Sequence, residues 1–177
     1  MHSTFGKAMD YAGGQYGEAI LSRVPLANVK VHELPTAKGC EPRAAVAAEI
    51  RFDGGQKFLF VGTHLEHANK EIRLSQAHAL NELFVKNSLP VILAGDLNAV
   101  PDSPPMKALR ENWKDAAAVG SKPTWPADKP RVRIDYVLLR PASAWRVIEA
   151  RVDDETVASD HRPVLVVLEY TGGRANK

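Results

Sequence analysis

The apolar run Pro90-Val91-Ile92-Leu93-Ala94, which stops at Gly95, is the feature that most constrains the fold. A short run rich in branched apolar residues that ends at a glycine is typical of a buried strand. Asp96 and Asn98 then lie at the carboxyl end of that strand, and their spacing puts both side chains on one side of an extended segment. A carboxylate beside an amide suits a hard divalent cation and a phosphate oxygen. An Asx turn that merely ends the strand is the alternative.

The composition and the charge are those of one soluble domain. The chain has 177 residues, 45% of them hydrophobic and 25% charged, which is enough to bury a core and gives no sign of disorder. The formal net charge of +2 allows a polyanionic partner without requiring one. Cys40 is the one cysteine, which excludes an internal disulfide and fits a reducing compartment. Because the sequence shows neither a membrane-spanning run nor a signal-peptide pattern, we expect a cytoplasmic protein without a membrane partner.

Turn residues and apolar spacing predict a mixed order of strands and helices. Ala44 to Phe52 and Lys57 to Thr63 flank Asp53-Gly54-Gly55, which predicts a β-hairpin. Apolar residues recur at helical spacing from Asn69, the expected N-cap, to Asn87. The other expected strands are Tyr16–Arg23, Val132–Leu139, Trp145–Val152 and Pro163–Tyr170, with a proline-rich loop region at 101–126.

This order favours α+β packing of layers over a regular βαβ alternation. No repeat or linker divides the chain, so we expect a single domain over residues 1–177 with a flexible tail at 171–177.

Polar segments adjoin four of the expected strands. They are Thr63-His64, Asp96 with Asn98, Arg133-Ile134-Asp135-Tyr136 and Ser159-Asp160-His161. A single histidine or aspartate in such a place is more often a cap or a satisfied partner than a catalyst. Together, however, the four segments carry the acid, amide and imidazole groups of hydrolytic phosphate chemistry.

These motifs resemble those of the endonuclease/exonuclease/phosphatase family, which includes pancreatic deoxyribonuclease, apurinic endonucleases, sphingomyelinases and inositol phosphatases. The resemblance covers about Phe5 to Tyr170 and is carried, in the family's order, by Tyr16-Gly17-Glu18-Ala19-Ile20-Leu21-Ser22, Thr63-His64-Leu65, Gly95-Asp96-Leu97-Asn98, Arg133-Ile134-Asp135-Tyr136 and Ser159-Asp160-His161-Arg162-Pro163. It implies an α+β fold, a two-layer β-sandwich flanked by helices in the four-layer deoxyribonuclease-like arrangement. It also implies hydrolysis of a phosphoester with Mg²⁺ or Mn²⁺ as cofactor and Ca²⁺ as an alternative.

The resemblance gives each central residue a catalytic role. His161 would face the reacting phosphate, with Asp135 fixing its tautomer and orientation. Asp96 would hold or deprotonate the attacking water, which Asn98 would help to place. His64 would donate a hydrogen bond to a non-bridging phosphate oxygen.

The outer residues have less specific roles. Asp160, Asp96 and Asn98 would bind the metal. Glu18 resembles the carboxylate that orients the second histidine in the deoxyribonuclease branch, and an exposed strand residue is the alternative. Arg43 either faces the substrate or is an ordinary surface arginine.

One departure from the family pattern shapes the expected function. The family's domain normally begins with a strand that carries an asparagine and, after a helix, a second strand that carries a metal-ligand glutamate. The sequence has neither segment, so we expect an N-terminally truncated domain.

Two functions therefore remain open. The first is a metal-dependent phosphoesterase, either a phosphodiesterase or nuclease or a phosphatase. With a net charge near neutral, its substrate would be a small phosphodiester or a single-stranded end rather than duplex DNA. The second is a truncated, catalytically weak or inactive relative that acts as a self-associating or binding module. Strand edges exposed by the truncation would in either case favour a homodimer.

Overall fold

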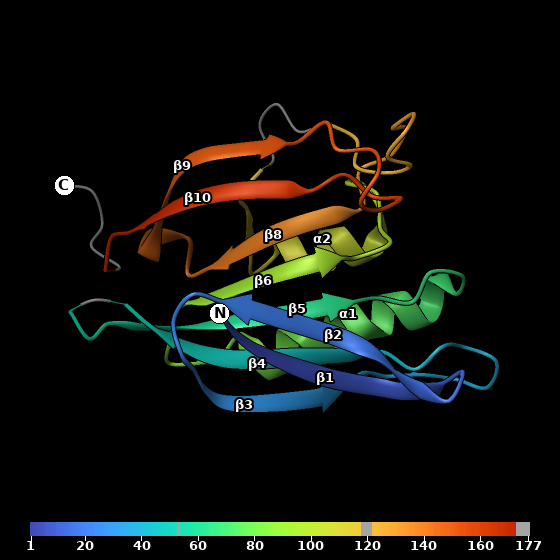
Figure 1. Ribbon diagram of the computed structural model, residues 1–177, viewed down its shortest axis with the longest axis horizontal. Helices are drawn as coiled ribbons and strands as arrows, with labels where there is room; N and C mark the ends of the chain where they lie inside the picture. The colour runs from blue at the N-terminus through green and yellow to red at the C-terminus, as the bar shows by residue number, and fades with distance from the viewer. Residues whose placement is uncertain (53, 118–121, 173–177) are drawn as a thin grey trace.

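A mixed six-stranded sheet forms the middle of the molecule (Figure 1). The computed structural model describes residues 1–52, 54–117 and 122–172, so the expected turn residue Asp53 and most of the expected tail lie outside the described residues. The strand order is β3-β4-β5-β6-β8-β7, in which β5 and β6 run parallel and the other neighbours run antiparallel. The strands are β3 (Leu26–Glu33), β4 (Ala44–Arg51), β5 (Lys57–His64), β6 (Val91–Asp96), β7 (Lys114–Asp115) and β8 (Asp135–Arg140).

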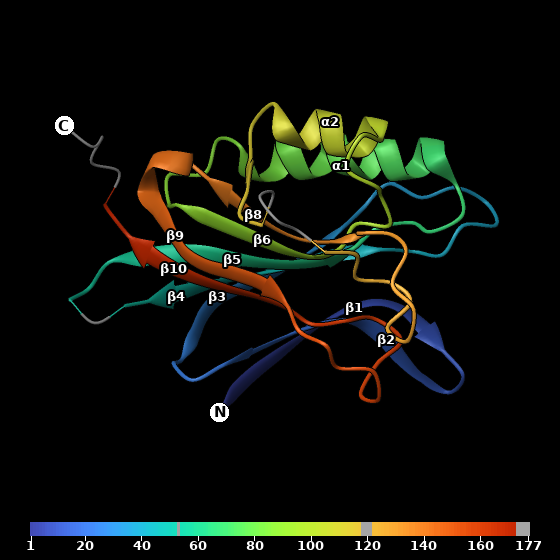
Figure 2. The same ribbon diagram turned by 90° about the horizontal axis from the view of Figure 1, so that it is seen from above.

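Two helices cover one face of this sheet, as Figure 2 shows. Helix α1 (Lys70–Phe84) connects β5 to β6, which makes the parallel pair possible. It begins at the predicted N-cap Asn69, whose side chain accepts hydrogen bonds from two backbone amides of the first turn. Helix α2 (Pro104–Arg110) begins with the prolines of the expected loop region.

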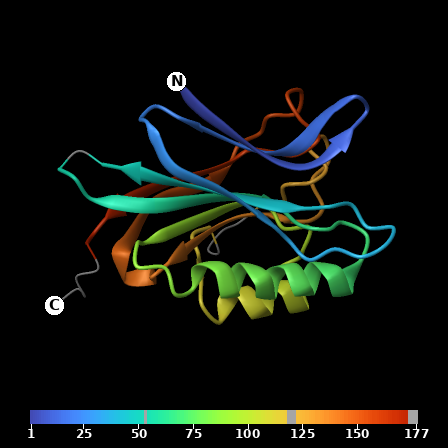
Figure 3. The ribbon, with the colours of Figure 1, turned by 90° about the horizontal axis from the view of Figure 1, so that it is seen from below.

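Two separate hairpins form the second layer on the opposite face (Figure 3). One pairs β1 (His2–Tyr11) with β2 (Gly14–Ser22), and the other pairs β9 (Trp145–Val152) with β10 (Val164–Tyr170). A short 3-10 turn, η1 (Ala142–Ala144), leads from β8 into β9. The α+β fold is therefore a two-layer β-sandwich flanked by helices, and its described α-helices lie on the outer face of the central sheet.

The core has two halves because the central sheet is buried on both faces. Leu93 packs with residues of both helices, including Leu80 and Leu109, whereas its neighbour Ile92 packs with Trp145 on the hairpin side. Successive residues of a strand point to opposite faces, so a strand covered on both sides reads as a continuous apolar run. This is why Pro90–Ala94 could be predicted as a buried strand.

Candidate active site

Three polar side chains stand in a row across one end of the central sheet. His64 is the register partner of Asp96, and Asp96 is the register partner of Asp135. Gly95 makes this possible, because a Cβ at that position would lie 1.8 Å from the carbonyl oxygen of Thr63. A larger residue would push β6 away from β5 and separate His64 from Asp96.

Asp96 and Asn98 are joined by the Asx turn that the sequence offered as the alternative. The backbone N–H of Asn98 donates to Asp96 Oδ1 at 2.8 Å, and Asn98 has a left-handed φ of 47°. The turn belongs to the site, because Asn98 Nδ2 donates to the carbonyl oxygen of Leu65 at 2.9 Å and lies 3.0 Å from His64 Nε2. The turn and the site are thus the same structure.

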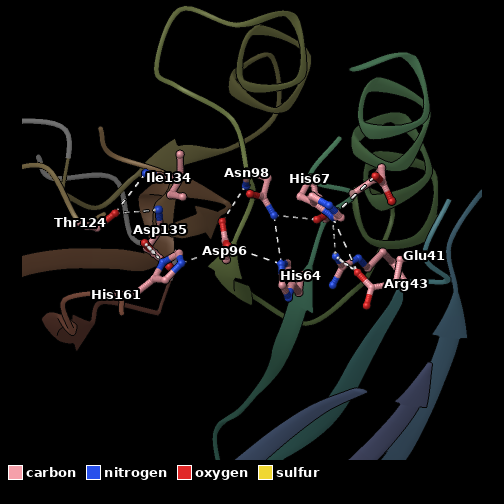
Figure 4. Close-up of polar contacts among 12 residues, drawn as sticks. Glu41, Arg43, His64, His67, Asp96, Asn98, Thr124, Ile134, Asp135 and His161 are labelled. Atoms are coloured by element: carbon pink, nitrogen blue, oxygen red, sulfur yellow. Dashed lines mark hydrogen bonds and ion pairs between the residues drawn. The ribbon is translucent and has the colours of Figure 1, made fainter. Parts of the chain in front are cut away.

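His161 and Asp135 form the predicted pair. His161 Nδ1 lies 2.9 Å from Asp135 Oδ2, so the ring donates to the carboxylate and turns its other nitrogen toward the row (Figure 4). Burial alone would lower the pKa of His161, but the hydrogen bond that the ring donates to Asp135 and the nearby acidic charges raise it overall. The buried hydroxyl of Thr124 accepts the backbone N–H groups of Ile134 and Asp135 and so holds the start of β8 in place.

The Asp96 carboxylate lies between two imidazoles (Figure 4). Its Oδ2 is 3.4 Å from His64 Nε2 and 3.8 Å from His161 Nε2. Burial raises the pKa of Asp96 to about 6, and the negative charge of Asp135 adds to the rise. A carboxylate of this kind is ionised at neutral pH and can still accept a proton in a reaction.

A second polar cluster lies beside His64 and contains Tyr16, Glu41, Arg43 and His67. Arg43 is 3% exposed; it donates to Glu41 Oε2 at 2.6 Å and to the hydroxyl oxygen of Tyr16 at 3.1 Å. The Tyr16 hydroxyl in turn lies 3.3 Å from His64 Nδ1. The predicted substrate residue Arg43 is therefore buried behind the row, and direct contact between Arg43 and substrate stays a prediction.

His64 is held neutral by its surroundings. Burial, and next the positive charge of Arg43, lower the pKa of His64 to about 4. Both ring nitrogens have partners within the protein, Tyr16 on one side and Asn98 with Asp96 on the other. Donation from His64 to a phosphate oxygen, which the sequence predicted, stays a prediction that would require one of these partners to move.

The depressed pKa of His64 predicts how acid affects the metal-free protein. Unfolded His64 has a pKa near 6.5, so the unfolded chain binds the proton first and the folded state loses stability as the pH falls from about 6.5 toward 4. Between pH 7 and pH 5 this loss should be about 2 kcal/mol. His64→Gln should therefore lose less stability on acidification than the parent, and urea unfolding of both proteins at the two pH values measures the difference. Equal losses would contradict the neutral assignment of His64.

Glu18 and Asp160 lie at the edge of this arrangement. The Glu18 carboxylate makes no hydrogen bond among the described residues. Burial and the negative charge of Asp96 raise its pKa, although the positive charge of Arg43 opposes the rise. The Tyr16 hydroxyl is the described partner of His64 Nδ1, and the orienting role of Glu18 stays a prediction. Asp160 is exposed, and its backbone carbonyl accepts a hydrogen bond from Ala127. Its metal-binding role stays a prediction.

Three groups of the described residues are close enough together to hold a metal ion. Ligand atoms of Asp96, Asp135 and His161 all lie within 4.8 Å of one another. Among the described residues, Asn98 Oδ1 and the Glu18 carboxylate beside them have no hydrogen-bond partner. Oxygen-rich groups that repel one another and lack protein partners fit a hard divalent cation.

Sequence reasoning missed three residues of the site: Tyr16, His67 and Thr124. Tyr16 is two residues before Glu18 on the same strand, so the alternation of strand side chains could have placed it on the site face. His67 follows His64 by three residues and contacts Arg43 at 3.4 Å. Thr124 lies in the long loop region, where nothing in the sequence indicates that it approaches β8.

Comparisons with known proteins match most of the chain. A model of the Endonuclease/Exonuclease/phosphatase family matches residues 3–161. No curated protein sequence matches the chain. Among similar solved structures, a functionally unknown conserved protein from Enterococcus faecalis has 17% identity and a TM-score of 0.81 over 96% of this chain and 77% of its own.

Two further structures carry functional descriptions. A mannosyl-6-phosphatase from Bacteroides thetaiotaomicron is 20% identical, with a TM-score of 0.77 over 95% of this chain and 77% of its own. TDP2 from D. rerio, complexed with a single-strand DNA product, is 20% identical, with a TM-score of 0.72 over 94% of this chain and 77% of its own. At these identities the likeness shows a shared fold.

Proposed function

The chain belongs to the endonuclease/exonuclease/phosphatase family, and we propose that it is a divalent-metal-dependent phosphoesterase that hydrolyses a P–O bond by attack of water. The observation that carries this proposal is the Asp96 carboxylate between His64 and His161, at the end of the central sheet. A base and an acid on the two sides of one position can move protons to and from a reacting phosphate. The same chemistry serves phosphodiesters and phosphomonoesters.

Each side chain has a role that follows from its contacts. Asp135 holds His161 Nδ1, which leaves Nε2 to face the phosphate. The hydrogen bond to Asp135 and the nearby acidic charges raise the pKa of His161, which favours the form of the ring that donates from Nε2. Asp96 accepts a proton from the attacking water, and Asn98 helps to place that water. His64 Nε2 lies 3.0 Å from Asn98 Nδ2 and so holds the Asn98 amide in place.

The metal would be held by Asp96, Asn98 and Asp160, with Mg²⁺ or Mn²⁺ as the expected ion and Ca²⁺ as an alternative. The repelling and unpartnered oxygen groups around Asp96 support a divalent cation beside that carboxylate. When bound, the ion neutralises charge on the phosphate and lowers the pKa of a bound water.

The candidate substrates are phosphomonoesters, small phosphodiesters and single-stranded nucleic acid. Similar structures are described as a mannosyl-6-phosphatase and as a complex with a single-strand DNA product. The net charge of +2 provides no dense basic face for duplex DNA, so we propose a small phosphodiester or a single-stranded end, acted on in a reducing cytoplasm.

A substrate panel tests this choice. Initial rates with a single-stranded oligonucleotide or a small phosphodiester should exceed those with a sugar phosphomonoester and the nicking of supercoiled plasmid under the same Mg²⁺, Mn²⁺ or Ca²⁺ conditions. Removal of the metal with a chelator should stop all of them. Efficient plasmid nicking would overturn the substrate proposal, and chelator-resistant hydrolysis would overturn the metal requirement.

The second candidate function, a self-associating module, is favoured by a groove in the hairpin layer. Strands β2 and β10 each have a partner on one side within the described residues, and their other edges face one another across the floor formed by β5 and β6 (Figure 1). The groove between them has a volume of about 620 Å³ and is lined mainly by apolar residues, including Leu21, Phe60, Ile92 and Leu168. Unpaired strand edges beside apolar surface favour pairing with another chain.

The exposed area supports a homodimer. The chain exposes 10123 Å², compared with about 8,500 Å² expected for a compact protein of 19.4 kDa. We propose a dimer interface of more than roughly 2,000 Å² in total. A second copy is the favoured occupant because a two-fold contact covers the same groove on both partners and then stops growing.

Dilution and one matched pair of variants test the dimer. Sedimentation over a hundredfold dilution in the micromolar range should show a stable dimer. Leu21→Lys, at a groove residue that is 69% exposed, should weaken it, whereas Val157→Lys, at a residue that is 91% exposed outside the groove, should not. A compact parent species of 19.4 kDa at every concentration would contradict the dimer.

A further inference from the structure

The hydroxyl of Tyr16 lies between the buried Arg43 and His64. Its hydroxyl oxygen accepts a hydrogen bond from Arg43 Nη1 at 3.1 Å, and the Arg43 side chain is 2% exposed. The same oxygen is 3.3 Å from His64 Nδ1. The buried Arg43 guanidinium thus fixes the position of the Tyr16 oxygen that faces the His64 ring.

The proton positions on His64 follow from the amide on its other side. The side-chain atom of Asn98 that lies 2.9 Å from the carbonyl oxygen of Leu65 must be the amide nitrogen, Nδ2, because a carbonyl oxygen can only accept a hydrogen bond. The second N–H of that amide points to His64 Nε2 at 3.0 Å. Nε2 is therefore an acceptor, and a neutral ring then carries its hydrogen on Nδ1 and donates it to Tyr16.

One contact favours the opposite tautomer. Asp96 Oδ2, at 3.4 Å from His64 Nε2, would accept a hydrogen from that nitrogen. This contact is longer than the amide contact, and a hydrogen on Nε2 would face an N–H of Asn98. The shorter amide contact therefore favours an unprotonated Nε2, and the Tyr16 oxygen, which is the described partner of Nδ1, is placed to accept the hydrogen of that nitrogen.

We propose that Tyr16 is a positioning residue of the site: with Arg43, it holds His64 as the Nδ1–H tautomer, and His64 Nε2 in turn holds the amide of Asn98. The amide nitrogen of Asn98 is then fully engaged, and its Oδ1 is left to bind a metal or the attacking water. The consequence for catalysis rests on the proposed hydrolytic function, whereas the tautomer does not.

The proposal predicts what happens when the hydroxyl is removed. Tyr16→Phe keeps the ring and its packing over Arg43 but takes away the acceptor for Nδ1. The hydrogen should then move to Nε2, where Asp96 accepts it, and the Asn98 amide should lose its partner. Tyr11→Phe is a matched control, because Tyr11 is on the same hairpin, is 65% exposed and packs edge-on against Tyr16 at 6.4 Å between ring centroids.

Long-range ¹H–¹⁵N spectra of histidine-labelled, metal-free protein at neutral pH provide the test. The parent and Tyr11→Phe should show a protonated Nδ1 and an unprotonated Nε2 for His64, whose signals are assigned by their loss in His64→Gln. Tyr16→Phe should show the reverse. A parent ring protonated at Nε2, or a Tyr16→Phe ring unchanged from the parent, would overturn the proposal.

Turnover distinguishes this inference from the proposed function. Where the protein hydrolyses a phosphoester, Tyr16→Phe should lower kcat by about 10- to 100-fold with an unchanged melting temperature, and Tyr11→Phe should not lower it. A protein with the predicted tautomer and no hydrolysis would refute the function and support the role of Tyr16. Hydrolysis by a parent protonated at Nε2 would support the function and refute that role.

Discussion

Asp135→Asn is expected to lower turnover by about 10²- to 10⁴-fold while the protein stays folded. The Asp135 carboxylate accepts the Nδ1 hydrogen of His161 at 2.9 Å, whereas an asparagine can present an N–H in its place. The ring would then carry its hydrogen on Nε2, the nitrogen that faces Asp96, and would lose the negative charge of Asp135 that helps to raise its pKa. Steady-state kinetics with saturating metal measures the loss.

The control for this variant is an aspartate far from the row. Asp10 is a surface residue of the first hairpin that pairs with Lys7, and Asp10→Asn should leave turnover unchanged. A melting transition like that of the parent shows that Asp135→Asn is folded. Parent-like turnover in a folded Asp135→Asn protein would show that the pairing of His161 and Asp135 has no catalytic role.

Asp96→Asn is expected to abolish turnover and, at the same time, to stabilise the metal-free protein. The carboxylate is the proposed base and metal ligand, so its loss should cost at least about 10³-fold in kcat. Its folded pKa of about 6 exceeds the unfolded value of 3.8, so its contribution to stability is present at low pH and is lost as the pH rises through 6. At pH 7 the neutral amide removes this penalty, and the free energy of unfolding should rise by about 1–3 kcal/mol.

Two measurements check the Asp96 prediction independently. Urea unfolding at pH 7 and at pH 4.5 should show a stabilisation of Asp96→Asn that is larger at the higher pH. The negative charge of Asp96 also contributes to the raised pKa of His161, so an NMR titration should give a lower pKa for His161 in the variant. A destabilised Asp96→Asn protein, or an unchanged His161, would contradict the electrostatic account of the row.

The elements with strong local signals could be predicted from the sequence. Trp145–Val152 was predicted as a strand with the bounds that β9 has, and Asn69 was predicted as the N-cap of α1. The motif at Gly95 located the end of β6 because a glycine is required there by the close approach of Thr63. These signals depend on residues near one another in the chain.

Two strands had no such signal. β1 (His2–Tyr11) is mostly exposed and has no regular alternation of apolar and polar residues, because it pairs with β2 alone among the described strands. β3 (Leu26–Glu33) is an edge strand of the central sheet with exposed side chains along most of its length. Strands that bury little surface carry little hydrophobic pattern, and periodicity cannot locate them.

Site residues within sequence motifs could be predicted, whereas contacts that form only when distant segments fold together could not. His64, Asp96, Asp135 and His161 were predicted together, and the register of three neighbouring strands brings the first three into one row. Glu18 was predicted either to orient His64 or to be an exposed strand residue, and the hydroxyl that lies nearest to His64 Nδ1 in the structure is that of Tyr16. Both residues lie on the same face of β2, and which of them reaches His64 depends on the position of Arg43, a contact that sequence spacing does not determine.

The most direct test of the hydrolytic site is the release of para-nitrophenol from bis-(para-nitrophenyl) phosphate by the parent and by His161→Ala, purified in the same way. The account predicts release by the parent with Mg²⁺ or Mn²⁺, no release after chelation, and a rate at least about 10²-fold lower for the variant. Equal rates for the two folded proteins, or no release by the folded parent with Mg²⁺, Mn²⁺ or Ca²⁺, would contradict it.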